Sequence, residues 1–194
     1  MPRRTKHTSA QITAAVKEIQ EQTDRGSAIV GAAMLEEILA VVLQKRMVDM
    51  NRDHYDSFFG LTGPGGGLSS KIELFYAFGL CNGSLYKAMH DIRGIRNKFA
   101  HRIEPLTFDE PEIAALVDRL APTHFDAPSR RQKFIGLLTL VLSLVYATGV
   151  DDIRVKFIGE THAALYIDLL KRFFPENADD FDKIWEDFNK GSSS

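Results

Sequence analysis

Apolar residues recur every three or four positions along most of this chain, and this period predicts helices rather than strands. The clearest example lies between Ser84 and about His101, where one apolar stripe would form the buried side of a helix. The stripe consists of Leu85, Met89, Ile92, Ile95 and Phe99. No convincing β-sheet pattern accompanies it, so the predicted fold class is all-α, a single-domain multi-helix bundle.

Similar periods predict the other helices, and capping residues mark where they begin. Asp24 or Ser27 can cap the second helix, and Ser84 can cap the fourth. We expect helices over residues 9–23, 24–48, 70–80, 84–101, 109–120, 130–150, 161–174 and 178–188, with a weak strand pattern over 153–158.

The segment between the second and third helices is rich in glycine, and residues 49–68 are predicted as a turn or hinge loop. A phosphate-binding loop would need a glycine followed by lysine and then serine or threonine, after a strand. Gly67 is followed by Leu68, so the run is interpreted as a connection between helices. Directly after it, Ser70-Lys71-Ile72-Glu73 matches a capping box, which predicts the start of the third helix.

The order of predicted elements divides the chain into four parts. We expect a flexible basic N-terminus over residues 1–8, a helical core over 9–122, a C-terminal helical elaboration packed on that core over 123–190, and a tail over 191–194. Residues 134–150 are uncharged over 17 positions, at the short end of the length that spans a membrane. A buried core helix is the interpretation that we favour, and no membrane association is expected.

Composition narrows the classes of function. The formal net charge of −2 argues against a large sequence-independent nucleic-acid surface, although it leaves room for a local basic cleft. The single cysteine, Cys81, excludes an internal disulfide and fits a reducing cytoplasm. The six histidines form no metal-binding pair at helical spacing. We therefore expect a cytoplasmic protein without a metal or cofactor.

Candidate chemistry is concentrated in the polar segment from Arg96 to His101. On an ideal helix Arg93, Asn97 and His101 are spaced four apart and share one face, and the long side chain of Arg96 can swing toward it. Arginine matches a phosphate with its planar fork, and histidine can move a proton near neutral pH. The alternative is structural, because polar residues at a helix end often hold the next loop and a histidine there gains from the helix dipole.

The residues also resemble a known family. The run Leu61-Thr62-Gly63, the glycine-rich loop, Leu68–Ile72, Tyr76–Leu80 and Ile92–His101 together are similar to the mannitol-operon-repressor (MltR-like) family over roughly residues 15–120. The apolar second helix with its acidic pair, Glu36-Glu37, fits the same pattern. This resemblance implies a helical fold and a role in transcriptional regulation. Since no helix-turn-helix with a basic recognition helix is present, such a regulator would act through protein contacts.

A second, broader resemblance concerns the motif alone. Arg96-Asn97 with His101 five positions after the arginine is similar to the R-x4-H pattern of HEPN-type helical domains. That superfamily includes metal-independent endoribonucleases of toxin and anti-phage systems, and also inactive binding modules, and its members typically form dimers with two motifs facing one cleft. The resemblance implies that Arg96 contacts the scissile phosphate, that Asn97 orients the reacting groups and that His101 acts as acid or base.

Two hypotheses follow. The favoured one is a non-catalytic MltR-like regulator that binds a protein partner; the alternative is a metal-independent endoribonuclease that uses Arg96 and His101 across a dimer cleft. A homodimer is expected in both cases, and RNA is a partner only in the second. The candidate catalytic residues are Arg96, Asn97 and His101, and the candidate substrate-binding residues are Arg93, Lys98 and His90.

Overall fold

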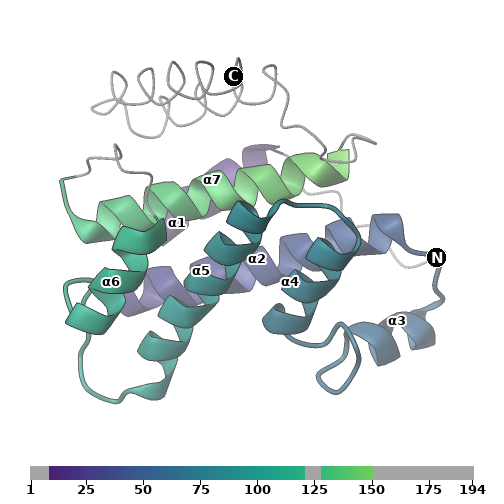
Figure 1. The fold of residues 1–194 in the computed structure, drawn as a ribbon, viewed down its shortest axis with the longest axis horizontal. Helices are drawn as coiled ribbons and strands as arrows, with labels where there is room; N and C mark the ends of the chain where they lie inside the picture. Colours follow the sequence, from purple (N-terminus) through teal and green to yellow (C-terminus); the bar gives the residue numbers. More distant parts are fainter. Residues whose placement is uncertain (1–8, 121–127, 151–194) are drawn as a thin grey trace.

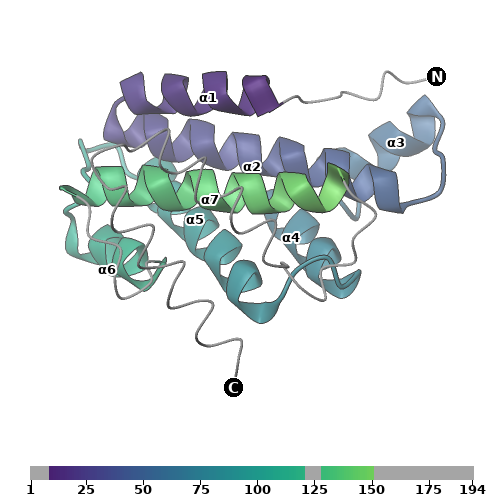
Figure 2. The ribbon, with the colours of Figure 1, turned by 90° about the horizontal axis from the view of Figure 1, so that it is seen from above.

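A computed structural model describes residues 9–120 and 128–150 of the chain, and every regular element in these two ranges is a helix. The elements are α1 (Ser9–Glu21), α2 (Asp24–Arg46), α3 (Arg52–Phe59), α4 (Leu68–Ala77), α5 (Gly83–His101), α6 (Pro111–Leu120) and α7 (Arg130–Val150). Helix α2 runs through the middle of the bundle and contacts α1, α4, α5 and α7 (Figures 1 and 2). The predicted all-α multi-helix bundle is confirmed. The predictions for residues 1–8 and 151–194 lie outside the described residues.

The predicted stripe of α5 forms the centre of the core. All five of its residues are at most 7% exposed, and they face the apolar side of α2. Stacked and edge-on rings continue this core: the Phe99 and Phe108 centroids are 5.1 Å apart, and those of Phe108 and Phe134 are 4.8 Å apart. These rings connect α5, the loop after it and α7. Burying each such side chain contributes about 1.5–3 kcal/mol to stability.

The apolar segment at 134–150 is a core helix, as expected. Phe134, Leu138 and Leu142 of α7 are buried, and α7 packs along α2. Gly31 of α2 makes the approach close, since a Cβ there would overlap with the Leu138 side chain. Among the described residues, α2 is the helix that is long and apolar enough to cross a membrane, yet 56% of its most apolar window is buried inside the protein. Its four neighbouring helices explain that apolar composition.

Two predicted caps are wrong by one or a few residues. The Thr23 side chain, rather than Asp24 or Ser27, accepts the hydrogen bond from the Gly26 N–H at 3.1 Å and caps α2. The Asn82 side chain, rather than Ser84, accepts from the Leu85 N–H at 2.9 Å and caps α5. In both places several adjacent residues have a suitable oxygen, and the path of the preceding chain decides which one caps.

The start of α4 also differs from the prediction. The helix begins at Leu68 after Gly67, which provides no side-chain cap, so Ser70 lies inside the first turn and the predicted capping box does not form. Its end is closed by Gly79 at φ +68°, which allows the Leu80 N–H to bond the Phe75 carbonyl at 3.0 Å. Glycine is favoured at this position because other residues are strained at positive φ.

The segment predicted as a loop contains a short helix, so that prediction is wrong for residues 52–59. The Asn51 side chain caps this helix, α3, by accepting from the His54 N–H at 2.9 Å. The glycine-rich run then folds back onto it, since a Cβ at Gly63 would overlap with the Ser57 carbonyl oxygen. The glycines therefore permit close backbone packing rather than phosphate binding.

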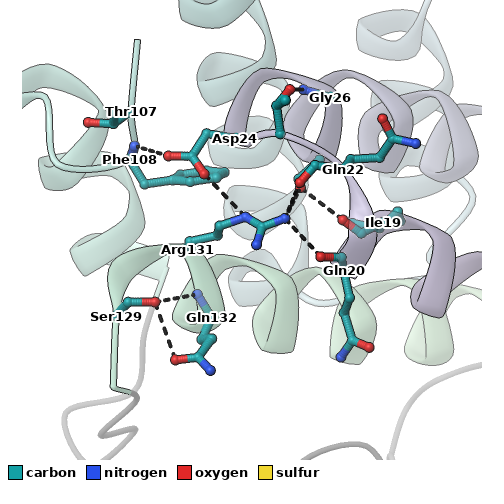
Figure 3. A network of polar contacts seen from close by, with 12 residues as sticks. Ile19, Gln20, Gln22, Asp24, Gly26, Thr107, Phe108, Ser129, Arg131 and Gln132 are labelled. Atoms are coloured by element: carbon teal, nitrogen blue, oxygen red, sulfur yellow. Dashed lines mark hydrogen bonds and ion pairs between the residues drawn. The ribbon is translucent and has the colours of Figure 1, made fainter.

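A network centred on Arg131 joins three separate segments (Figure 3). Its Nη2 donates to the carbonyls of Gln20, at 3.0 Å, and Gln22, which are exposed where α1 ends. Its Nε forms an ion pair with Asp24 Oδ1 at 3.2 Å without hydrogen-bond geometry, while Asp24 Oδ2 accepts from the Phe108 N–H at 3.1 Å. One arginine at the start of α7 thus holds α1, α2 and, through Asp24, the loop between α5 and α6.

Candidate functional site

All six candidate site residues lie on α5, and the structure confirms the predicted geometry of the motif itself. Arg96 and His101 are exposed, and Arg93 and Asn97 are half-buried. The Arg96 Nη1 donates to the Asn97 Oδ1 at 3.0 Å, so the arginine does reach round to the neighbouring polar face. We call Arg93, Arg96, Asn97 and His101 the α5 basic face.

The end of α5 is held by a residue outside the motif. Arg25 of α2 donates from Nη2 to the carbonyl oxygens of Arg102 at 2.9 Å and Glu104 at 2.6 Å. Within the described residues, Arg96 and His101 make no hydrogen bond to the loop that follows the helix. The bracing role that the structural alternative gave to the motif is therefore filled by Arg25, and the motif side chains stay on the surface.

Lys98 and His90 differ from the α5 basic face because both have acidic partners on neighbouring helices. Lys98 forms a short ion pair with Glu112 of α6, whose carboxylate also lies 3.4 Å from Arg102. The hydrogen bond from Lys98, and then the charges of Lys98 and Arg102, hold the pKa of the Glu112 carboxyl below its usual value. These contacts make Lys98 part of the α5–α6 contact.

His90 belongs to an aromatic cluster shared by α4 and α5. The ring centroids of Tyr76 and Tyr86 are 4.7 Å apart, and those of Tyr86 and His90 are 4.6 Å apart. Glu73 accepts a hydrogen bond from the Tyr86 hydroxyl at 2.9 Å and lies 3.2 Å from His90 Nε2. The bond to Glu73 is the main reason why the pKa of Tyr86 is raised.

Sequence spacing contained the signal for Tyr86, which the prediction missed. Positions 86, 90, 93, 97 and 101 step by four, three, four and four, so they follow one side of α5. One side of α5 therefore carries the rings of Tyr86 and His90 toward its start and the α5 basic face toward its end. The other residues that the prediction missed, Arg25 and Arg131, act through backbone carbonyls and carry no motif signal.

The α5 basic face lies outside the two cavities that the described residues form. A cavity of about 190 Å³ beside it is lined by Lys98, Arg102 and residues of α6 and the preceding loop, and a second of about 450 Å³ lies between α2 and α3. None of the four residues of the face lines either cavity. Two guanidinium groups and an imidazole on one surface can bind carboxylate or phosphate groups presented by a partner.

We also searched the described part of the chain for a metal-binding cluster and for a reactive cysteine. No group of three or more histidine, cysteine, aspartate or glutamate side chains there is arranged to hold a metal ion. Cys81 is buried, and burial raises the pKa of its thiol to about 12. Since the thiolate is the reactive form, Cys81 behaves as a small apolar core residue.

The fold and this face together define an all-α bundle with one open basic helix surface. Among solved structures, the chain is similar in fold to the X-ray structure of the MtlR–HPr complex from Escherichia coli, with a TM-score of 0.58 and 18% sequence identity. The match covers 71% of this chain and 99% of the matched chain. No protein-family model and no curated protein matches the sequence. The predicted MltR-like fold is thus supported, while the HEPN-like motif stays a prediction.

Proposed function

We propose that this chain is a regulatory protein of the mannitol-operon-repressor type that acts by binding a partner protein through the α5 basic face. The observation that carries the proposal is that the basic side chains of this face have no acidic partner among the described residues. Arg93, Arg96 and His101 have no ion pair among the described residues, whereas Lys98 on the same helix is paired with Glu112. Such unpaired basic side chains, of which Arg96 and His101 are exposed, favour an acidic partner surface.

The fold supports a protein as that partner. The solved structure with a similar fold was determined as a complex with HPr, and the similarity extends over 99% of the matched chain. The open surface is also suited to a macromolecule, because a small substrate would need a cavity that removes most of it from water. HPr is the first partner to test. A cytoplasmic location, a homodimer and an effect on transcription through protein contacts belong to this proposal.

A charge-reversal pair on α5 tests the partner surface. Arg96→Glu changes the charge of the α5 basic face, and Lys87→Glu makes the same change at an exposed position near the start of the helix. We expect Arg96→Glu to weaken HPr binding by about tenfold, or ~1.4 kcal/mol, and Lys87→Glu to change it less than about twofold, measured by isothermal titration calorimetry. Absence of HPr binding to the unmodified protein, or an equal loss in both variants, would contradict the proposal.

The second candidate is the metal-independent ribonuclease, and one contact favours it. The hydrogen bond between Arg96 and Asn97, with His101 exposed one turn further on, resembles the arrangement that the R-x4-H motif requires. An RNA strand supplies its own 2′-hydroxyl nucleophile, and a second copy of the chain would enclose the phosphate. Cleavage of RNA in the presence of EDTA that is lost in Arg96→Ala and His101→Ala, with unchanged melting temperatures, would support this candidate. A chain inert toward RNA would exclude it.

A further inference from the structure

A cavity in the described part of the chain lies away from α5, between α2 and α3. It has a volume of about 450 Å³, within the usual range for sites that bind small molecules or single side chains of a partner. Residues from three helices line it: Glu36 and Glu37 from α2, Tyr55, Asp56 and Phe59 from α3, and Lys71 from α4. This lining combines carboxylates with aromatic rings.

One buried lysine connects two of the segments around the cavity. Lys71, only 4% exposed, donates from Nζ to Glu36 Oε1 at 2.9 Å and to the Gly66 carbonyl at 3.0 Å. It therefore ties the glycine-rich loop to α2. Glycines of the same loop pack closely against backbone carbonyl oxygens of α3, as Gly63 does against Ser57. The glycine run and the buried lysine together build this cavity.

The charge of the lining is negative. Three carboxylates, Glu36, Glu37 and Asp56, line the cavity together with one ammonium, Lys71, which is paired with Glu36, and Glu37 makes a further contact within the chain. Asp56 has a second neighbour, Arg52, but this ion pair is long, at 3.6 Å, and largely exposed to water. Burial, followed by the charges of Asp56 and Glu37, raises the pKa of Tyr55.

Aromatic rings supply the second feature. The Tyr55 and Phe59 rings are in contact, with centroids 4.8 Å apart at an interplanar angle of 40°, and both side chains are half-buried at the wall of the cavity. Ring faces attract ammonium and guanidinium groups, and the attraction grows when the cation leaves water. Neighbouring carboxylates supply the opposite charge that such a group needs.

We propose that this cavity binds an organic cation through an alkylammonium or guanidinium group, between the rings of Tyr55 and Phe59 and the carboxylates of Glu37 and Asp56. The group comes either from a free amine or from a lysine or arginine side chain of a protein. This site is separate from the α5 basic face, so it stands or falls independently of the proposed function. The opposite charges of the two surfaces also give them different ligands.

Titration calorimetry with two probes tests the site in the full chain at about 150 mM salt, where exposed charges are screened. Spermidine represents a free amine, and N-acetylarginine amide represents a protein side chain. The double variant Glu37→Gln/Asp56→Asn removes two carboxylates from the cavity, and Glu18→Gln/Glu21→Gln removes two exposed carboxylates from α1. We expect the cavity variant to weaken binding by roughly fivefold to tenfold and the α1 variant by less than about twofold.

The probes and a ring variant separate the outcomes. Tighter binding of spermidine assigns the site to free amines, and tighter binding of the arginine probe assigns it to a protein side chain. Tyr55→Ala should weaken either probe by about threefold or more if the ring contributes. The proposal is overturned if neither probe binds, or if both double variants lose the same affinity, which would indicate counterion binding only. Melting temperatures of all variants identify any that fail to fold.

Discussion

Two clusters of this molecule are built around arginines whose surroundings differ: one is the network around Arg131, and the other is the α5 basic face with Arg96. Arg131 donates to two carbonyls and to the Ser27 hydroxyl, and it pairs with Asp24. Arg96 makes one hydrogen bond, to its neighbour Asn97, and no ion pair within the described residues. Both arginines lie close to a helix end. The difference teaches that Arg131 braces the fold because it meets the bare carbonyls at the end of another helix, whereas Arg96 meets none.

The two clusters are mechanically connected through the first turn of α2. Asp24 pairs with Arg131 and holds the Phe108 N–H, and the next residue, Arg25, holds the carbonyls that follow α5. The cluster around Arg131 therefore fixes the end of α5, the helix that carries Arg96 and His101. Preorganised positions of Arg96 and His101 would reduce the entropy lost when a partner binds.

The largest expected effect is a loss of stability when Arg131 is replaced. Arg131→Met keeps the apolar stem but removes every polar contact, leaving the Asp24 carboxylate and two carbonyls without their partner, so we expect the free energy of unfolding to fall by about 2–3 kcal/mol. Urea denaturation measures it. Arg130→Met, which breaks only the exposed pairs with Asp109 and Asp118, should cost less than about 1 kcal/mol.

Arg96→Met extends this comparison to the α5 basic face. It should change the free energy of unfolding by no more than about 0.5 kcal/mol, as exposed substitutions away from structural contacts usually do. A loss in Arg96→Met as large as that in Arg131→Met would show that both clusters brace the fold, and the contrast drawn between them would fail.

Most of the fold could be predicted from the sequence because it depends on local periodicity. The stripe of α5 from Leu85 to Phe99 is buried as predicted, and α7 is a core helix. Helix α3 was missed because it has only eight residues and no buried side chain, and its three aromatic residues, Tyr55, Phe58 and Phe59, span little more than one turn. Capping residues were misassigned where several adjacent oxygens could serve, as at Thr23 and Asp24.

In the candidate site, too, local spacing could be predicted from the sequence, and contacts with distant residues could not. Helical spacing correctly placed Arg93, Asn97 and His101 on one side of α5, with Arg96 able to reach Asn97. It could not show that Lys98 and His90 are occupied, because their partners, Glu112 and Glu73, lie 14 and 17 residues away on other helices. Arg131 was still less predictable, since its carbonyl partners are 111 and 109 residues distant and any residue type supplies a carbonyl.

An intermediate effect is expected where the two clusters meet. Arg25→Met leaves the carbonyls of Arg102 and Glu104 without their donor, although water can replace part of the contact at this exposed position. We expect a loss of about 1 kcal/mol in urea denaturation, and faster amide hydrogen exchange confined to the last turn of α5. Exchange that accelerates throughout the bundle would instead mean that Arg25 supports the core. Unchanged exchange in α5 would remove the mechanical connection proposed between the clusters.

The smallest expected effect is a pH-dependent loss of stability. It distinguishes Lys98, which is paired with Glu112, from Arg96, which has no ion pair among the described residues. The pKa of Glu112 is lowered in the folded state by Lys98 and Arg102, whereas in the unfolded chain it returns to its ordinary value of 4.5. Ionised Glu112 therefore stabilises the fold at pH values above 4.5, and this contribution is lost as the pH falls through the lower pKa of the folded state.

Glu112→Gln tests this directly, and its effect should disappear in acid. Urea midpoints measured between about pH 3 and about pH 7 should show the variant slightly less stable at neutral pH and equal to the unmodified protein at the acid end. Arg96→Gln should show no such convergence, because no carboxylate pairs with Arg96 among the described residues. A pH-dependent difference in Arg96→Gln would reveal an acidic partner within the chain, and the α5 basic face would then be occupied before any partner arrives.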